Sequence, residues 1–325
     1  MLYRPDSPAQ LAAASAPRVG ILSNPNSTLN RHGGRFRRSD HPDLACVLDR
    51  AVGDAAQLPA ALQACRDRGV THLILNGGDG TVQSVLSALT AAGGYDPVLG
   101  ILPGGKTNLI ARNLGMAGTP DQQWRLLATM IARGRSRDHV IRHPVLRLDM
   151  GDGSPPRTGF FFGSAALVEA VRLSRRLYTG GVPQPLAHGV VLAWQGLRSL
   201  IILPHRARAS LGLCVDDLDS GPFSSRSGLV PTLSQLVLGF RLQRDGADMA
   251  RARLLAVGPD RGAFVSAMAT LLSRRTQTTG PVRAGAATTI RLTGAGPILF
   301  DGEILHPARE AGLTLTTEAG YRFLC

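Results

Sequence analysis

The chain has little of what several common classes of protein need. Only 5% of its 325 residues are aromatic, so its cores must consist mostly of Leu, Val, Ile and Ala. Its four cysteines, Cys46, Cys65, Cys214 and Cys325, show no CxxC spacing and no pairing with histidines. This pattern argues against a disulfide framework or a zinc site, and a reducing compartment is the simplest expectation.

Long apolar runs are also scarce. The first residues, 1–17, lack an apolar core of the length that a signal peptide needs, and we interpret them as a loose leader. The stretches 188–204 and 227–240 do not reach the about 20 uninterrupted apolar residues that a membrane span requires. Both are predicted to be core helices, with a lipid-receiving pocket or an interfacial helix as the alternative.

Lysine is almost missing, since Lys106 is the only one, yet arginine gives the chain a formal net charge of +13. Such a charge attracts nucleic acid and anionic lipid surfaces alike. The arginines are spread along the chain, and no aromatic residues alternate with them as stacking platforms. A solvated or membrane-facing basic surface is therefore favoured over nucleic-acid binding.

The first part of the chain alternates short apolar runs with segments of helical spacing. The expected strands are 18–22, 71–75 and 97–102, and the expected helices are 43–52, 58–69, 81–92, 107–115 and 124–134. Strands that alternate with helices predict a parallel sheet that is covered on both faces. Beyond residue 140 the segments become shorter and more strand-like, which predicts a mainly β second domain with helical insertions.

A glycine-rich loop follows the strand expected at 71–75 and leads directly into a helix. Gly77, Gly78 and Gly80 place no Cβ where a phosphate would approach the main chain, and glycine readily adopts positive φ. Asp79 would be repelled by bare phosphate, so a place beside Mg²⁺ or a hydroxyl suits it better. The alternative is an ordinary strand-to-helix turn with Asp79 as the N-cap.

Two more polar loops follow neighbouring strands, at 23–27 and 102–108. Because the carboxyl ends of parallel strands meet at one edge of a sheet, the three loops are expected to form one ligand crevice. Residues 100–107 also match the phosphate loop of P-loop NTPases. Gly100, however, lies inside an apolar run, so the remaining loop is too short to surround a phosphate. Lys106 stays a candidate phosphate contact as a point charge.

The ordered set of motifs resembles the diacylglycerol kinase catalytic-domain family, which includes sphingosine and ceramide kinases and bacterial relatives. The motifs are NPNS at 24–27, GGDGT at 77–81, LPGGKTN at 102–108 and DGE at 301–303. The resemblance implies an N-terminal α/β domain with a parallel sheet that binds ATP, formed by residues 1–140 and completed by 311–325. It also implies a C-terminal β-sandwich lipid domain at 141–310.

The resemblance maps functional residues onto single positions of this chain. The implied nucleotide-binding residues are Asn24, Ser27, Gly77, Gly78, Gly80, Thr81, Gly104, Gly105, Lys106, Thr107 and Asn108. Asp301 is expected to be the base that accepts the proton of a lipid hydroxyl, while Asp79 and Glu303 arrange Mg²⁺. Some members of the family use the GGDG aspartate as the base instead. A surface β-turn is the alternative interpretation of DGE.

The sequence departs from the family pattern near these loops. Gln83 and Ser84 stand where an Asn-Glu pair is usual, so one carboxylate that could help the metal or the nucleotide is missing. Lys106 stands where many members have threonine, and Leu109 stands where aspartate is frequent. These changes affect the expected nucleotide contacts and leave both aspartates in place.

The prediction is an ATP-dependent and Mg²⁺-dependent lipid kinase, a phosphotransferase that acts on the hydroxyl of ceramide, diacylglycerol or a related sphingoid lipid. It is expected to be cytoplasmic and peripherally associated with the inner membrane through an anionic lipid surface, and an oligomer is compatible with the sequence. One alternative is an NAD-kinase-like enzyme, which shares GGDGT. Another is a non-catalytic lipid- or nucleotide-binding regulator, which the missing carboxylate at Ser84 suggests.

Overall fold

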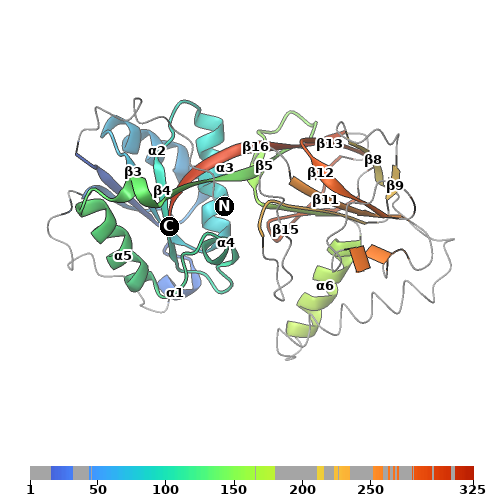
Figure 1. Ribbon diagram of the computed structural model, residues 1–325, viewed down its shortest axis with the longest axis horizontal. Coiled ribbons are helices and arrows are strands. Elements are labelled where there is room, and N and C mark those ends of the chain that lie inside the picture. Colours follow the sequence, from blue (N-terminus) through green and yellow to red (C-terminus); the bar gives the residue numbers. More distant parts are fainter. Residues whose placement is uncertain are drawn as a thin grey trace. The chain divides into compact units, whose positions relative to one another are not determined.

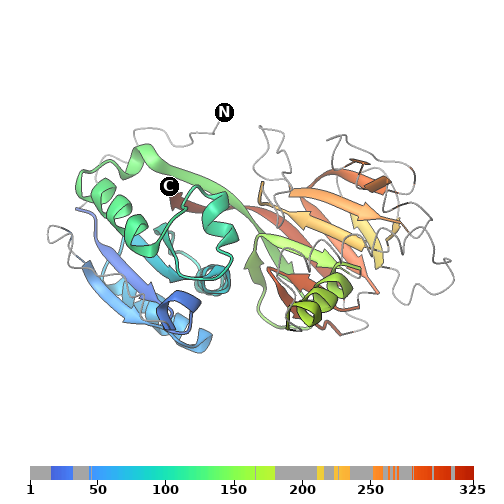
Figure 2. The ribbon, with the colours of Figure 1, turned by 90° about the horizontal axis from the view of Figure 1, so that it is seen from below.

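The computed structural model describes most of the chain. The described ranges are 16–31, 44, 46–164, 166–179, 211–215, 223–225, 227–234, 252–258, 280, 282–294, 296–308 and 312–325, with a few positions between 263 and 270. The contacts divide the chain into two compact units, Met1–His143 with Ala319–Cys325 and Pro144–Glu318. Figures 1 and 2 show the elements of each unit from two directions.

The first unit is a parallel sheet with helices packed on it (Figure 1). Its strands are β1 (Val19–Ser23), β2 (Cys46–Ala51), β3 (His72–Gly77) and β4 (Val98–Pro103), in the order β2-β1-β3-β4. All three neighbouring pairs are parallel. Its helices are α1 (Thr28–Arg31), η3 (Ala55–Gln57), α2 (Leu58–Asp67), α3 (Asp79–Ala92), α4 (Leu109–Asn113), α5 (Pro120–Ala132) and η4 (Ser136–His139).

The sheet of the first unit is buried on both of its faces. All six residues of β3 are buried, although successive side chains of a strand point to opposite faces. On one face Ile74 packs with Trp124 and Leu127 of α5, and on the other Leu73 and Leu75 are 0% exposed. The predicted parallel sheet with two covered faces is therefore confirmed.

One predicted helix of this unit is wrong. Residues 43–52 have apolar positions at helical spacing, but Cys46–Ala51 form the strand β2, which pairs in parallel with β1. The strand lies at the end of the sheet order, and its last three residues are exposed. Pairing with β1 satisfies the backbone of this short segment along one side, which outweighs its weak helical periodicity.

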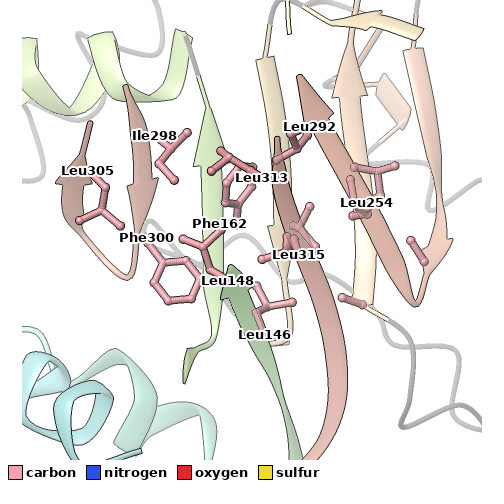
Figure 3. Packing of buried hydrophobic residues seen from close by; sticks show 14 of the residues in the cluster. Leu146, Leu148, Phe162, Leu254, Leu292, Ile298, Phe300, Leu305, Leu313 and Leu315 are labelled. Atoms are coloured by element: carbon pink, nitrogen blue, oxygen red, sulfur yellow. The ribbon is translucent and has the colours of Figure 1, made fainter. Parts of the chain in front are cut away.

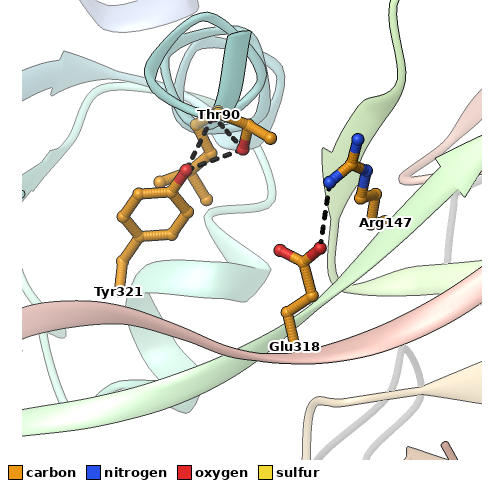
Figure 4. Close-up of polar contacts among 5 residues, drawn as sticks. Thr90, Arg147, Glu318 and Tyr321 are labelled. Carbon is orange, nitrogen blue, oxygen red and sulfur yellow. Dashed lines mark hydrogen bonds and ion pairs between the residues drawn. The ribbon is translucent and has the colours of Figure 1, made fainter. Parts of the chain in front are cut away.

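The end of the chain completes the first unit. The last strand, β16 (Leu313–Leu324), lies parallel to β4 where Phe323 pairs with Leu99. The phenol oxygen of Tyr321 lies 2.7 Å from the hydroxyl oxygen of Thr90 on α3, as Figure 4 shows. Tyr321 also donates a hydrogen bond of 3.1 Å to the carbonyl of Leu86. These contacts fix the last strand to α3.

The second unit contains two groups of strands around one core. Residues of β5 (Val140–Asp149) and β16 pair with each other, and β16 continues to β13 (Thr289–Thr293), β8 (Leu211–Val215) and β9 (Phe223–Ser225), while β6 (Arg157–Gly159) pairs with β5. The other group is a six-stranded antiparallel sheet in the order β12 (Val282–Ala287), β11 (Ala252–Val257), β10 (Ser227–Pro231), β7 (Phe161–Ser164), β14 (Ile298–Phe300) and β15 (Glu303–Leu305). Helix α6 (Ala166–Thr179) follows β7.

The core of the second unit lies between its two groups of strands. Figure 3 shows Leu148 and Leu315 from the first group packed with Phe162, Leu254 and Phe300 from the antiparallel sheet. Apolar residues alternate along these strands, so one face of each sheet enters the common core. This arrangement confirms the predicted β-sandwich.

The second long apolar stretch does not begin as the predicted core helix. Ser227–Pro231 form β10, which pairs with β7 on one side and β11 on the other. Pairing on both sides buries Leu229 and Val230 as strand residues. Residues 235–240 and the whole first stretch, 188–204, lie outside the described residues. In the described ranges, every helix is too short or too polar to cross a bilayer.

Candidate nucleotide-binding site

A cleft of about 400 Å³ lies in the first unit, where the polar loops follow the strands. Because β1, β2 and β3 are parallel, their carboxyl ends meet at one edge of the sheet. The residues that line the cleft are Leu22, Ser23, Asn24, Asn26, Ser27, Thr28, Val52, Gly53, Asp54, Ala55, Leu58, Gly78, Gly80, Thr81, Ser84, Val85 and Gly105. This set combines main chain, amides and hydroxyls with a small apolar part.

All three predicted glycine and polar loops contribute to the cleft. The predicted residues that line it are Asn24, Ser27, Gly78, Gly80, Thr81 and Gly105. The predicted residues outside its lining are Gly77, Gly104, Lys106, Thr107 and Asn108. Lys106 and Thr107 are exposed. Gly77, Gly104 and Asn108 lie among the loops themselves, where their contacts shape the cleft.

Sequence reasoning missed a fourth segment of the cleft wall. Val52, Gly53, Asp54 and Ala55 follow β2 and line the cleft, together with Leu58 at the start of α2. The carboxylate of Asp54 caps the short helix η3 by accepting a hydrogen bond of 3.0 Å from the amide of Ala56. The sequence does contain a signal for this loop, because a turn follows the apolar run at 43–52. The helical spacing of that run, however, predicts a helix and not a strand that ends in a loop at the cleft.

Hydrogen bonds join the loops into one body. Asn24 donates from Nδ2 to the hydroxyl of Thr81 at 2.9 Å, which connects the first loop to α3. The amide of Leu29 donates to the carbonyl of Gly104, and the amide of Gly104 donates to the carbonyl of Gly77, both at 2.9 Å. The walls of the cleft are therefore preorganised before a ligand binds.

The glycines of these loops are required for close packing of one loop on another. A Cβ on Gly105 would lie 2.6 Å from the Cα of Gly78, and a Cβ on Gly77 would lie 2.4 Å from the hydroxyl oxygen of Thr81. None of the predicted loop glycines has positive φ, so that part of the sequence argument is wrong. A Cβ on Gly80 would meet nothing within 4 Å, because Gly80 borders the open cleft.

Asn108 holds the third loop in shape. Its backbone is left-handed, with φ of 48°. Its Oδ1 accepts a hydrogen bond of 2.8 Å from the amide of Gly105, and its Nδ2 donates to the carbonyls of Pro103 and Gly105. Asparagine tolerates this backbone conformation better than most residues. The Asn108 side chain thus stabilises the loop, and Gly105 is the residue of this loop that lines the cleft.

Asp79 makes its contacts with a neighbouring helix. Its Oδ2 accepts a hydrogen bond of 3.0 Å from the amide of Leu109, and its Oδ1 accepts one of 2.9 Å from the amide of Ile110. Both amides belong to the first turn of α4, where backbone donors lack partners within the helix. The N-cap of α3 is Gly78, so the expected cap at Asp79 serves α4 and not its own helix.

The hydroxyl group of Ser27 is buried beside the cleft. Ser27 lines the cleft, yet it is only 8% exposed. Among the described residues its Oγ has no hydrogen-bond partner. A buried hydroxyl without a partner costs free energy, and a ligand with a polar group in the cleft would remove that cost.

The DGE motif forms a tight hairpin in the second unit. Phe300 of β14 pairs with Glu303 of β15, and Asp301 and Gly302 form the two-residue loop with φ of 45° and 88°. Two successive positive φ values indicate a type I′ turn, for which Asp-Gly is well suited. The β-turn interpretation of these residues is therefore confirmed as local structure, and the functional role of the motif stays a prediction.

The Asp301 carboxylate is held by the strand beside it. Both of its oxygens lie 3.0 Å from the amide nitrogen of Phe160, which donates to them. A Cβ on Gly159 would lie 2.3 Å from Oδ2, so glycine at this position leaves room for the carboxylate. Asp301 thus combines a left-handed backbone, which the type I′ turn requires, with a carboxylate that is fixed in position.

The two other acidic residues of the prediction are engaged in different contacts. Glu303 forms an ion pair of 2.8 Å with Arg157, and both side chains are largely exposed. Across the described part of the chain, no group of three or more His, Cys, Asp or Glu side chains is arranged to hold a metal ion. Mg²⁺ usually keeps several waters and takes one or two carboxylates together with substrate phosphates, so a single carboxylate would be enough beside a bound nucleotide.

Comparison with solved structures gives the class of the fold. The crystal structure of a diacylglycerol kinase from Bacillus anthracis strain Sterne superimposes with a TM-score of 0.61 over 95% of this chain and 96% of that one, at 14% identity. At this identity the similarity establishes the fold: an α/β unit with a parallel sheet, followed by a β-rich unit.

Comparison of sequences narrows the class for the first unit. Residues 18–139 match the family model of the diacylglycerol kinase catalytic domain, which confirms the resemblance that the motifs predicted. The proteins named "Probable lipid kinase YegS" from Escherichia coli O6:K15:H31 (strain 536) and from Shigella flexneri are 40% identical to this chain over 117 residues. The matched segment spans 35% of this chain and 38% of each relative.

Proposed function

We propose that the protein is an ATP-dependent lipid kinase that transfers the γ-phosphoryl group of ATP to the hydroxyl of a lipid. The observation that carries the proposal is the preorganised cleft in the first unit, where Gly78, Gly80 and Gly105 expose main chain beside the buried Ser27 hydroxyl. Phosphates bind well to exposed backbone amides at the start of a helix, and α3 starts at this cleft. The family match over residues 18–139 supports the same activity.

The lipid hydroxyl is the nucleophile of the proposed reaction. Its oxygen attacks the γ-phosphorus, the bond from that phosphorus to the β,γ-bridging oxygen breaks, and ADP leaves. The hydroxyl proton passes to the carboxylate of Asp301, which the amide of Phe160 holds in place. Bound Mg²⁺ would neutralise charge on the phosphates. Asp79 or Glu303 would supply its carboxylate ligand, and for Asp79 this role is added to its hold on α4.

The acceptor in this proposal is diacylglycerol, ceramide or a related sphingoid lipid, and the enzyme works in the cytoplasm at the inner membrane surface. The net charge of +13 supports attraction to anionic lipid.

The test is transfer of labelled phosphate from ATP to diacylglycerol, ceramide, sphingosine and phosphatidylglycerol in mixed micelles, with NAD as a soluble control. Two variants accompany the wild type. In Asp301→Asn the hairpin is retained, because Asn-Gly also favours a type I′ turn, so a large loss of transfer would reflect proton acceptance. In Gly80→Ala the new Cβ enters the cleft, and ATP binding is expected to weaken at least several-fold.

The outcomes separate the proposal from its rivals. A labelled lipid product that forms with the wild type but not with Asp301→Asn supports the lipid-kinase activity and identifies the acceptor. Transfer to NAD alone would replace it with an NAD-kinase-like activity. Tight lipid or nucleotide binding without any transfer would indicate a non-catalytic regulator.

A further inference from the structure

Arg283 in the second unit has hydrogen-bond donors that no group in the described part of the chain accepts. It lies on β12, opposite Ala256 of β11, and its Nε and Nη1 atoms are buried. Within the part of the chain that the structure describes, neither nitrogen has a hydrogen-bond partner. An arginine keeps its charge under all ordinary conditions, so burial of these donors without an acceptor is unfavourable.

An aromatic ring lies beside this guanidinium group. Its Cζ lies 5.0 Å from the centre of the Phe223 ring on β9, and Phe223 packs against the sandwich core that contains Ala256. The ring attracts the cation through its face, but the N–H groups point outward in the guanidinium plane and gain no acceptor from it. The stack therefore orients the group and leaves its buried donors without an acceptor.

We propose that Arg283 and Phe223 form a binding subsite for an oxyanion, namely a phosphate group. The planar guanidinium group donates charge-assisted hydrogen bonds to phosphate with good geometry. Nε and Nη1 are buried, but the residue as a whole is only partly buried, so a small shift of the side chain would bring these donors to a phosphate group. The phosphate comes from an anionic lipid or from free phosphate, and the Phe223 ring beside the guanidinium is suited to the lipid. This subsite does not depend on the proposed kinase activity.

The experiment compares the melting temperature of the full chain with that of Arg283→Met, with and without phosphate at matched ionic strength. Two further arms use vesicles of phosphatidylglycerol and of phosphatidylcholine. Met keeps the length of the side chain and removes the unpaired charge. Arg172→Met, at an exposed position on α6, removes the same charge elsewhere in the second unit. Phosphate can also bind the cleft of the first unit, so the deciding quantity is the difference between variants.

The wild type and Arg172→Met are expected to gain a few degrees in melting temperature with the phosphate ligand, and Arg283→Met is expected to gain clearly less. A difference with inorganic phosphate indicates free phosphate, and one seen only with phosphatidylglycerol indicates a lipid headgroup. Equal gains in wild type and Arg283→Met, both with inorganic phosphate and with phosphatidylglycerol vesicles, would overturn the subsite.

If Arg283→Met does not fold, Arg283→Lys takes its place. Lysine keeps the charge and the contact with Phe223 but lacks the planar fork of donors. A smaller gain than that of the wild type supports the subsite, and an unchanged gain contradicts it.

Discussion

The Oδ1 atom of Asp79 accepts a hydrogen bond of 2.9 Å from the backbone amide of Ile110, which lies 31 positions later in the chain. Through this bond the aspartate of the GGDG loop fixes the helix that follows the LPGGKTN loop. Asp79, which the sequence predicts as a catalytic or Mg²⁺-binding residue, is therefore also a structural link between two loops of the candidate site. Its replacement must affect stability as well as activity.

Asp79→Asn should lower the free energy of unfolding by about 1–2 kcal/mol, because an amide has one acceptor oxygen where the carboxylate uses two. Urea denaturation measures this change. The control is Asp67→Asn, at an exposed position of α2, where the side-chain oxygen can still accept from Gln63. If both variants change stability equally, the link to α4 contributes little.

Gly105→Ala and Gly80→Ala should have opposite effects on stability. The Cβ at position 105 would lie 2.6 Å from the main chain of Gly78, and overpacking of this kind typically costs about 1–3 kcal/mol. The Cβ at position 80 meets open space, and alanine in a helix is up to about 1 kcal/mol more favourable than glycine. Thermal unfolding of the two variants tests this contrast. Equal stability would contradict the close contact of the loops.

Tyr321→Phe should destabilise the protein by about 1 kcal/mol, because the phenol oxygen contacts the Thr90 hydroxyl and the Leu86 carbonyl. The measurement is a double-mutant cycle with Thr90→Val. A coupling energy of about 0.5–1 kcal/mol is expected, since the two side chains are in contact. Additive effects would show that the contact does not tie the last strand to α3.

Below neutral pH, stability should fall because of His72. Burial, with a smaller effect of Arg322, lowers the pKa of His72 from 6.5 to about 4. Between these values the unfolded chain binds more protons than the folded one, so stability decreases as the pH falls from 6.5 toward 4. The loss can reach about 3 kcal/mol. Urea denaturation across this range should show a weaker pH dependence for His72→Gln, and an unchanged dependence would exclude His72 as its source.

The Arg147–Glu318 ion pair should contribute little to stability. Its atoms are 3.4 Å apart and both side chains are about two-fifths exposed, as Figure 4 illustrates. Water and salt weaken such a pair, which typically contributes at most about 1 kcal/mol. Glu318→Gln should therefore change the free energy of unfolding only slightly. A loss above about 1 kcal/mol would indicate a larger role for this pair.

The sequence by itself determined the features that depend on local pattern. Buried strands such as β3, helices such as α3 and α5, and the order of the polar loops follow from apolar spacing and glycine placement, which act within a few residues. The Asp-Gly hairpin at Asp301 was likewise within reach, because the two residues specify their turn directly.

Only the tertiary structure decided the features that depend on distant partners. The segment Cys46–Ala51 became a strand because β1 offers its edge, and that pairing placed Asp54 in the wall of the cleft. Asp79 caps a helix 30 positions away, and Arg283 lies over a ring from another sheet. No local pattern encodes these contacts, because they arise only when separate elements pack together and exclude water from the groups between them.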